Sequence, residues 1–272
     1  MNNPFETKHY PNLSESFGVI GLVLLASIVI SIPFMGVKYL ASDIEDINSI
    51  ISLLGYLIPF TIVSVYLYKK IKKQDSNFSL KFKFPETKLL LILIPLTLAL
   101  SIVIEPIVTF IPMPDFVKEL FESMITNDIY SLITVAFLAP VLEEIIFRGI
   151  ILNGLLKNYS PIKAIVWSAA LFGIVHLNPW QFIGAFIIGL VIGWIYWKTN
   201  SIIPGILIHF VNNFTASMVM MFSNDVNATT KQLFGGDFNY LMAYVFSAII
   251  ITLSFLYLYN TFNKKEKANL IS

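Results

Sequence analysis

Eight long apolar segments restrict the fold of this chain more than any other feature of its sequence. A helix needs roughly 20 mainly apolar residues to cross a hydrocarbon core about 30 Å thick. Segments of this kind lie near residues 17–37, 50–68, 89–111, 129–157, 162–177, 182–197, 202–222 and 240–259. Only 13% of the 272 residues are charged, against about 25% in a typical soluble domain. We therefore predict an all-α, polytopic membrane protein in which about eight transmembrane helices form one bundle.

The chain is predicted to be a single helical membrane domain over residues 1–272. It contains no Pro/Gly/Ser-rich linker, no low-complexity tract and no repeat evident by inspection. The apolar segment behind the polar N-terminus is longer than the core of a signal peptide, so we expect a retained first span. Cysteine is absent, which excludes disulfides, thiol nucleophiles and cysteine-ligated zinc.

The charged residues predict how the chain lies in a cell membrane. Lysines gather in the loop at residues 69–88 and in the tail at 264–267, whereas acidic residues occupy the alternate loops. By the positive-inside rule, both termini and the lysine-rich loop face the cytoplasm, which requires an even number of spans. We interpret the basic loop as an orientation signal toward anionic lipid. Membrane lipids are therefore predicted partners, and nucleic acid is not.

A carboxylate pair and the only arginine stand inside the fourth apolar segment, as Glu143, Glu144 and Arg148. An ionised side chain at membrane depth costs roughly 2.5–3.5 kcal/mol on insertion scales, so three together need a structural or chemical reason. Residues i and i+4 share a helix face, which predicts an ion pair between Glu144 and Arg148. Glu143 points elsewhere and has no partner on its own helix. An unpaired carboxylate in apolar surroundings is suited to act as a general base.

Two of the three histidines, His176 and His209, also lie within apolar segments. Asn213 follows His209 by one helical turn and shares its face. A single intramembrane histidine is often a hydrogen-bonded packing element. Two histidines together with an unpaired glutamate favour a functional site.

Residue counting predicts the depth of these side chains. The segment Lys157–Pro161 is expected to be the turn of a helical hairpin, with its proline at a helix start. Glu143 lies about 16 residues before the middle of that turn and His176 about 17 after it, so both sit roughly 25 Å from the turn. We expect them at the same level.

The same count gives His209 a shallower position. From a turn at Asn200–Ser201, His209 is about 12 Å and Asn213 about 19 Å into the membrane. Asn213 should therefore approach the Glu143 level more closely than His209. Tilt, or a kink after Pro204, must supply the difference.

These residues resemble the motifs of the CPBP family of intramembrane proteases. That family contains the type II CAAX prenyl endopeptidases and the bacterial Abi proteins of bacteriocin processing and self-immunity. Its pattern is EExxxR, then FxxxH, then HxxxN. The matching positions are Glu143, Glu144 and Arg148, then Phe172 and His176, then His209 and Asn213. The match covers roughly residues 139–214, and it places a catalytic core at about 129–222.

The resemblance implies hydrolysis of a peptide bond within the membrane. It implies a water activated by Glu143 with His176, and an oxyanion stabilised by His209 and Asn213. We expect Phe172 to pack beneath His176 rather than to touch substrate.

The family is also described as metalloproteases, and Glu143, His176 and His209 form a possible zinc-ligand set. No HExxH motif is present, and these ligands come from three separate helices. A metal-free glutamate mechanism explains Asn213 more directly and is favoured. The cofactor prediction is therefore none, with zinc left open.

Two other functions fit parts of the pattern. A transporter or proton relay also uses intramembrane Glu, His and Arg, but it predicts symmetric repeats that are not evident in this chain. A non-catalytic bacteriocin self-immunity or regulatory protein would carry the same motifs unused. The low-Arg, Lys- and Ile-rich composition suggests an AT-rich bacterium. A prenylated CAAX-type substrate would need a prenylating host, so another membrane-associated peptide or protein is the expected substrate.

Overall fold

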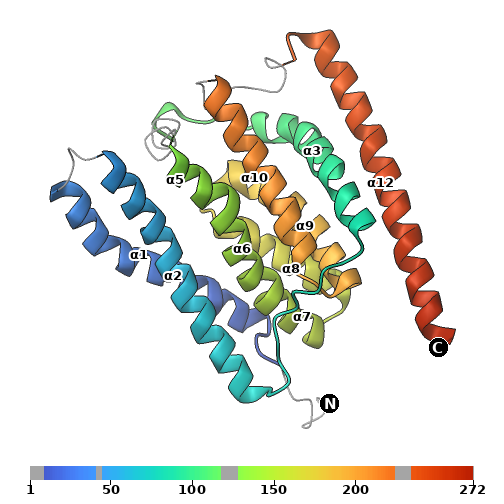
Figure 1. The fold of residues 1–272 in the computed structure, drawn as a ribbon, viewed down its shortest axis with the longest axis horizontal. Coiled ribbons are helices and arrows are strands. Elements are labelled where there is room, and N and C mark those ends of the chain that lie inside the picture. Colours follow the sequence, from blue (N-terminus) through green and yellow to red (C-terminus); the bar gives the residue numbers. More distant parts are fainter. Residues whose placement is uncertain (1–8, 41–44, 118–127, 224–233, 272) are drawn as a thin grey trace.

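The computed structural model describes residues 9–40, 45–117, 128–223 and 234–271, and these ranges fold into helices joined by short connections (Figure 1). Within the described ranges there is no strand. The long helices are α1 (Leu13–Leu40), α2 (Glu45–Gln74), α3 (Thr87–Thr109), α9 (Pro179–Thr199), α10 (Ile203–Ser223) and α12 (Asp237–Ile271). These six are long and apolar enough to cross a membrane. The all-α, polytopic membrane fold is thus confirmed.

The other two predicted spans are also helical. The fourth is one continuous helical run with changes of helix type, made of α5 (Ile129–Leu132), η1 (Ile133–Leu138), α6 (Ala139–Glu144), η2 (Ile145–Leu152) and α7 (Asn153–Asn158). The segments η1 and η2 are π-helical. The fifth is α8 (Pro161–Ile174), whose 14 residues rise about 21 Å.

Local signals set the helix ends near the site. Pro161 and Pro179 occupy the first turns of α8 and α9, where a missing backbone N–H costs nothing. The Asn178 side chain accepts a hydrogen bond from the Gln181 backbone N–H and caps α9. Asn200 ends α9 in the left-handed conformation, with φ 47°. The two turns expected at 157–161 and 200–201 are therefore present.

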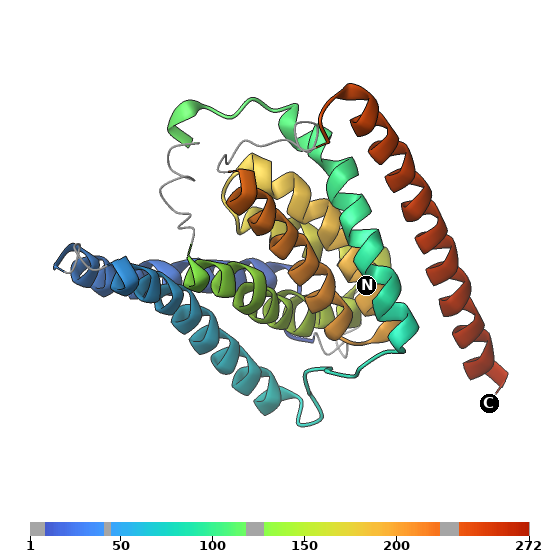
Figure 2. The same ribbon diagram turned by 45° about the horizontal axis from the view of Figure 1, so that its top comes forward.

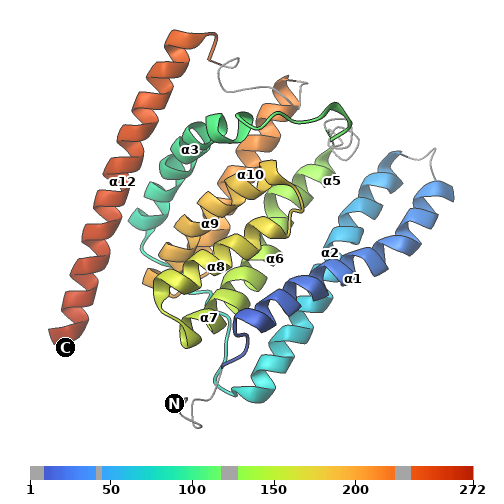
Figure 3. The ribbon, with the colours of Figure 1, turned by 180° about the vertical axis from the view of Figure 1, so that it is seen from behind.

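The composite helix α5–α7 and the helices α8 to α10 form the middle of the molecule, with α1 and α2 on one side and α3 and α12 on the other (Figures 1 and 3). One buried cluster of apolar side chains joins α1, α2, η2 and α8, and a second joins α3, α9, α10 and α12. In a second view, α12 lies along α3 at the edge of the bundle (Figure 2). The centre is thus enclosed by helices on both sides.

Polar contacts tie several connections together at one end of the bundle. Lys157 lies 3.2 Å from Asp75, and this hydrogen bond lowers the pKa of the Asp75 carboxyl. The backbone N–H of Ile202 donates to Lys81 in the segment between α2 and α3, at 2.9 Å. Lys265 near the end of α12 lies 2.9 Å from the glutamate at position 86. The connections 75–86, 157–160 and 200–202 and the end of α12 therefore lie at the same end.

Candidate active site

The predicted ion pair is present and completely buried. Arg148 Nη1 donates to Glu144 Oε1 at 2.8 Å, and neither side chain is exposed to solvent. Arg148 Nη2 also donates to the backbone carbonyl of Gly189 in α9, at 3.3 Å. Its guanidinium carbon lies 4.6 Å from the centre of the Phe172 ring. Arg148 therefore joins the composite helix to both α8 and α9.

The Glu144 carboxylate fits against a glycine of α10. A Cβ atom added at Gly205 would lie 2.5 Å from Glu144 Oε2 and 2.7 Å from Ile192. Real Cβ atoms essentially never show separations below 3.0 Å. The absence of a side chain at position 205 thus lets α10 approach the buried carboxylate.

Glu143 is nearly buried, with 8% of its surface exposed. Its Oε1 accepts a hydrogen bond of 2.5 Å from the Tyr56 hydroxyl of α2. Its Oε2 lies 3.8 Å from His209 Nε2 and has no hydrogen-bond partner within the described part of the chain. One carboxylate oxygen is therefore occupied, and the other is open toward His209.

Sequence reasoning missed Tyr56, because α2 lies outside the three motifs. A weak signal was present. Tyrosine in membrane proteins concentrates at the two interfaces, and a buried hydroxyl usually needs a hydrogen-bond partner. Tyr56 instead stands inside α2 between apolar residues, well away from both helix ends.

His209 lies between the two carboxylates. Its Nε2 is 3.8 Å from Glu143 Oε2, and its Nδ1 is 3.4 Å from Glu144 Oε1. The side chain is almost fully buried. The expectation that Asn213 approaches this level more closely than His209 was therefore wrong. Counting residues assumes helices perpendicular to the membrane and turns at equal depth, and neither condition needs to hold in a bundle.

His176 follows the end of α8 and is linked to the site through Phe172. Its Nδ1 lies 2.8 Å from the carbonyl oxygen of Phe172. Because a carbonyl can only accept, this contact assigns the proton to Nδ1 and leaves Nε2 as an acceptor in the neutral ring. The Phe172 ring makes edge contacts with both histidines, with centroid distances of 5.4 Å to His176 and 5.3 Å to His209. Phe172 thus packs between them.

Asn213 is held by the composite helix, and the reason lies in the local helix type. In η1 the N–H of Ala139 bonds to Thr134, five residues back. The next such bond would run from Pro140 to Val135, but proline has no N–H. The carbonyl of Val135 is therefore open to Asn213 Nδ2, which donates to it at 3.0 Å. Within the described ranges, the second amide hydrogen of Asn213 has no protein acceptor and can serve a ligand.

A hydrogen-bonded chain extends from Asn213 to α3. Asn213 Oδ1 accepts from Asn212 Nδ2 at 3.2 Å, and Asn212 Oδ1 accepts from the Ser101 hydroxyl at 3.2 Å. The Val135 carbonyl can only accept, so its contact with Nδ2 fixes which end of the Asn213 amide carries the donor.

The possible zinc ligands do not assemble into a metal site. Within the described residues, no three His, Cys, Asp or Glu side chains come close enough together to hold a metal ion. Glu143 and His209 lie close to one another, whereas His176 lies on the other side of the Phe172 ring. The donor set therefore does not fit a three-ligand zinc site.

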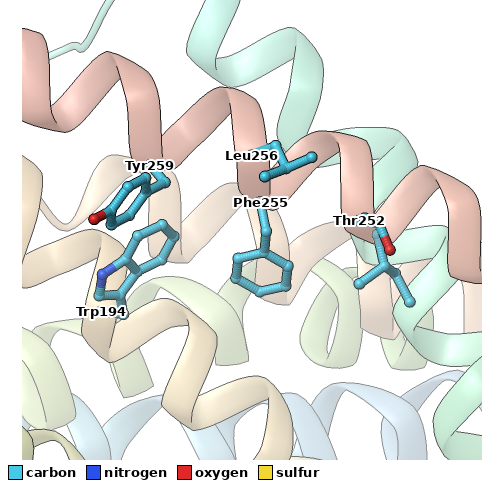
Figure 4. A pocket seen from close by; sticks show the side chains of 6 residues that line it. Trp194, Thr252, Phe255, Leu256 and Tyr259 are labelled. Carbon is cyan, nitrogen blue, oxygen red and sulfur yellow. The ribbon is translucent and has the colours of Figure 1, made fainter.

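A cavity of about 460 Å³ lies elsewhere, between α9 and α12 (Figure 4). Its lining is mainly apolar and includes Trp194, Phe255 and Tyr259. None of the motif residues lines it. We therefore assign the chemistry to the buried cluster around Glu143, which we call the Glu143 site: Glu143, Glu144, Arg148, Phe172, His176, His209 and Asn213.

Comparison with known families agrees with the motifs. Residues 125–215 match the model of the type II CAAX prenyl endopeptidase Rce1-like family. This segment contains every residue of the Glu143 site, and the resemblance stated from the motifs is confirmed. The matched family is a protease family, which supports peptidase activity at the family level. Comparisons with curated proteins and with solved structures gave no match.

Proposed function

We propose that this multi-pass membrane protein is an intramembrane endopeptidase that cleaves a membrane-associated peptide or protein with a water activated by Glu143. The observation that carries the proposal is the state of the Glu143 carboxylate. It is nearly buried, one oxygen is held by Tyr56, and the other is open beside His209. A nearly buried carboxylate with one free oxygen can act as a general base and take a proton from water.

In this mechanism Glu143 Oε2 removes a proton from a water molecule, whose oxygen attacks the carbonyl carbon of the scissile peptide bond. The carbonyl oxygen becomes an oxyanion. Glu143 then passes the proton to the leaving nitrogen, the C–N bond breaks, and a carboxylic acid and an amine result. Atoms and charge balance without a further reactant.

Oxyanion stabilisation falls to His209 and Asn213. His209 lies between the two carboxylates and presents its Nε2, 3.8 Å from Glu143 Oε2, as a ring donor for the oxyanion. Asn213 has an amide hydrogen to donate, and it lies one turn from His209 on the same face of α10. Preorganised donors of this kind are worth about 10²–10³ in rate each.

Three residues act by holding others in place. Glu144 lies 3.4 Å from Nδ1 of His209 and places a negative charge beside its ring. Arg148 neutralises Glu144, and Phe172 packs between the histidines. His176 would complete the site as a hydrogen-bond acceptor for the attacking water through Nε2.

We further propose that both termini face the cytoplasm. The lysine-rich connection after α2 and the lysine-bearing end of α12 lie at the same end of the bundle, joined by the contact of Lys265 with residue 86. This arrangement suits the positive-inside rule. Peptide pheromones and bacteriocin leaders are candidate substrates, since the composition suggests a bacterial source.

The test is cleavage of candidate membrane peptides by the purified protein in lipid nanodiscs, read by mass spectrometry. Glu143→Gln removes the base at nearly constant shape, and we expect at least a 100-fold loss of rate. Glu86→Gln, an exposed carboxylate at the end of the bundle, is the matched control and should cleave like the wild type.

Two outcomes would contradict the proposal. Cleavage by Glu143→Gln at the wild-type rate would exclude Glu143 as the base. Biological function retained in both Glu143→Gln and His176→Ala at unchanged expression would favour a non-catalytic self-immunity or regulatory protein. A chelator included in parallel tests the zinc alternative, because the metal-free mechanism predicts no change in rate.

A further inference from the structure

Among the described residues, Tyr56 is the one hydrogen-bond partner of the Glu143 carboxylate that comes from outside the motif-bearing part of the chain. The family match covers residues 125–215, and Tyr56 lies in α2. Its hydroxyl donates to Glu143 Oε1 at 2.5 Å. A phenol hydrogen-bonded to a carboxylate is a charge-assisted interaction, which is stronger than a neutral hydrogen bond.

A second contact, independent of the hydroxyl, holds the Tyr56 ring in place. It stacks on Phe60, one helical turn along α2, with a centroid distance of 4.5 Å and an interplanar angle of 18°. Phe60 itself is buried in the apolar cluster that joins α1 and α2 to the composite helix. A rigid aromatic ring loses little conformational entropy when its hydroxyl binds, so the donor is held in place.

The hydrogen bond from Tyr56 gives the two carboxylate oxygens of Glu143 different roles. Oε1 is occupied by Tyr56, and Oε2 has no hydrogen-bond partner among the described residues and lies beside His209. A carboxylate with neither oxygen held would be free to rotate about its last bond. With Oε1 held, Oε2 keeps a fixed direction toward the water that it must deprotonate.

We propose that Tyr56 is a positioning residue for the general base: it holds Glu143 Oε1 so that Oε2 points to the nucleophilic water. This inference rests on the proposed function. It assigns α2 a part in catalysis, although α2 carries none of the sequence motifs.

The experiment compares Tyr56→Phe with Tyr66→Phe, the same substitution at an exposed position of the same helix. The substrate is the membrane peptide that the wild type cleaves in the nanodisc assay. For Tyr56→Phe we expect kcat to fall about tenfold or more, with KM little changed. Tyr66→Phe should match the wild type in both quantities.

A second measurement does not depend on activity. In a thermal-unfolding cycle, Tyr56→Phe should lower the melting temperature of the wild type but not that of Glu143→Ala, because its partner is already gone. A wild-type kcat in Tyr56→Phe, or equal effects of Tyr56→Phe on the melting temperature in both backgrounds, would overturn the inference. If instead Glu143→Gln cleaves like the wild type, the proposed function fails, and the unfolding cycle still decides whether Tyr56 holds Glu143.

Discussion

Replacing Gly205 with alanine adds one carbon atom and thereby tests how closely α10 packs against the buried Glu144 carboxylate. The added Cβ would lie 2.5 Å from Glu144 Oε2, 2.7 Å from Ile192 Cγ2 and 3.2 Å from Glu144 Cδ. The carboxylate cannot move aside freely, because Arg148 holds it at 2.8 Å and both side chains are fully buried. Either the helices separate or the ion pair is distorted.

The magnitude follows from these contacts. Overpacking a dense core costs roughly 1–3 kcal/mol. Alanine regains about 0.5–1 kcal/mol because it favours the helix over glycine. Distorting the Glu144–Arg148 pair adds part of the roughly 3–5 kcal/mol that breaking a buried pair costs. We therefore expect Gly205→Ala to lower the free energy of unfolding by about 2–4 kcal/mol.

The matched control is Gly184→Ala in α9. A Cβ at Gly184 meets no heavy atom within 4 Å, so this variant should be neutral or more stable by about 0.5–1 kcal/mol. Unfolding is followed in detergent micelles by tryptophan fluorescence during titration with a denaturing detergent. A compensating change sharpens the test. Glu144→Asp shortens the carboxylate by one methylene, so it should cost less in the Gly205→Ala background than in the wild type.

Equal stability of Gly205→Ala and Gly184→Ala would refute this reasoning. It would mean that Glu144 does not lie against Gly205, and the close approach of α10 to the carboxylate would have to be abandoned. The same variant gives an activity readout, because Glu144 faces His209 at 3.4 Å. Displacing Glu144 should lower cleavage along with stability.

Two further predictions concern the same buried ion pair and the contact of Gly154 with the segment before α1. Arg148→Met should destabilise the protein by about 3–5 kcal/mol because it leaves Glu144 buried without its cation; the double variant Arg148→Met/Glu144→Gln should recover part of this loss, and additive losses in chemical unfolding would contradict a direct pair. Gly154→Ala should loosen the segment before α1, because its Cβ would meet the backbone of Pro11; limited proteolysis should then cut near residue 10 faster than in the wild type, and an unchanged cleavage rate would show that this contact is not needed.

Hydropathy and spacing predicted much of this structure for clear physical reasons. The eight apolar segments all fall on helices, because backbone polar groups in lipid must be satisfied within each segment. The pairing of Glu144 with Arg148 depends only on residues four apart on one helix, so it too could be read from the sequence. The hairpin turn before Pro161 follows from a local proline signal.

Contacts between separate helices could not be predicted in the same way. The level of His209 depends on how α10 is inclined and where its turn lies, and residue counting contains neither quantity. The contact of Tyr56 with Glu143 joins residues 87 positions apart. The role of Gly205 depends on which side chain of another helix faces it. These contacts depend on how the helices pack against one another. A single sequence does not show which residues of separate helices will meet.

Pro140 affects the Glu143 site because its backbone nitrogen carries no hydrogen. Because it has no N–H, the carbonyl of Val135 is left to Asn213. Substitution by alanine usually removes an interaction. In Pro140→Ala, however, the new backbone N–H would compete with Asn213 for the Val135 carbonyl. The helix would gain a bond of its own while the site lost an anchor. Stability and activity would then change in opposite directions, so at this position a more regular helix would be a poorer enzyme.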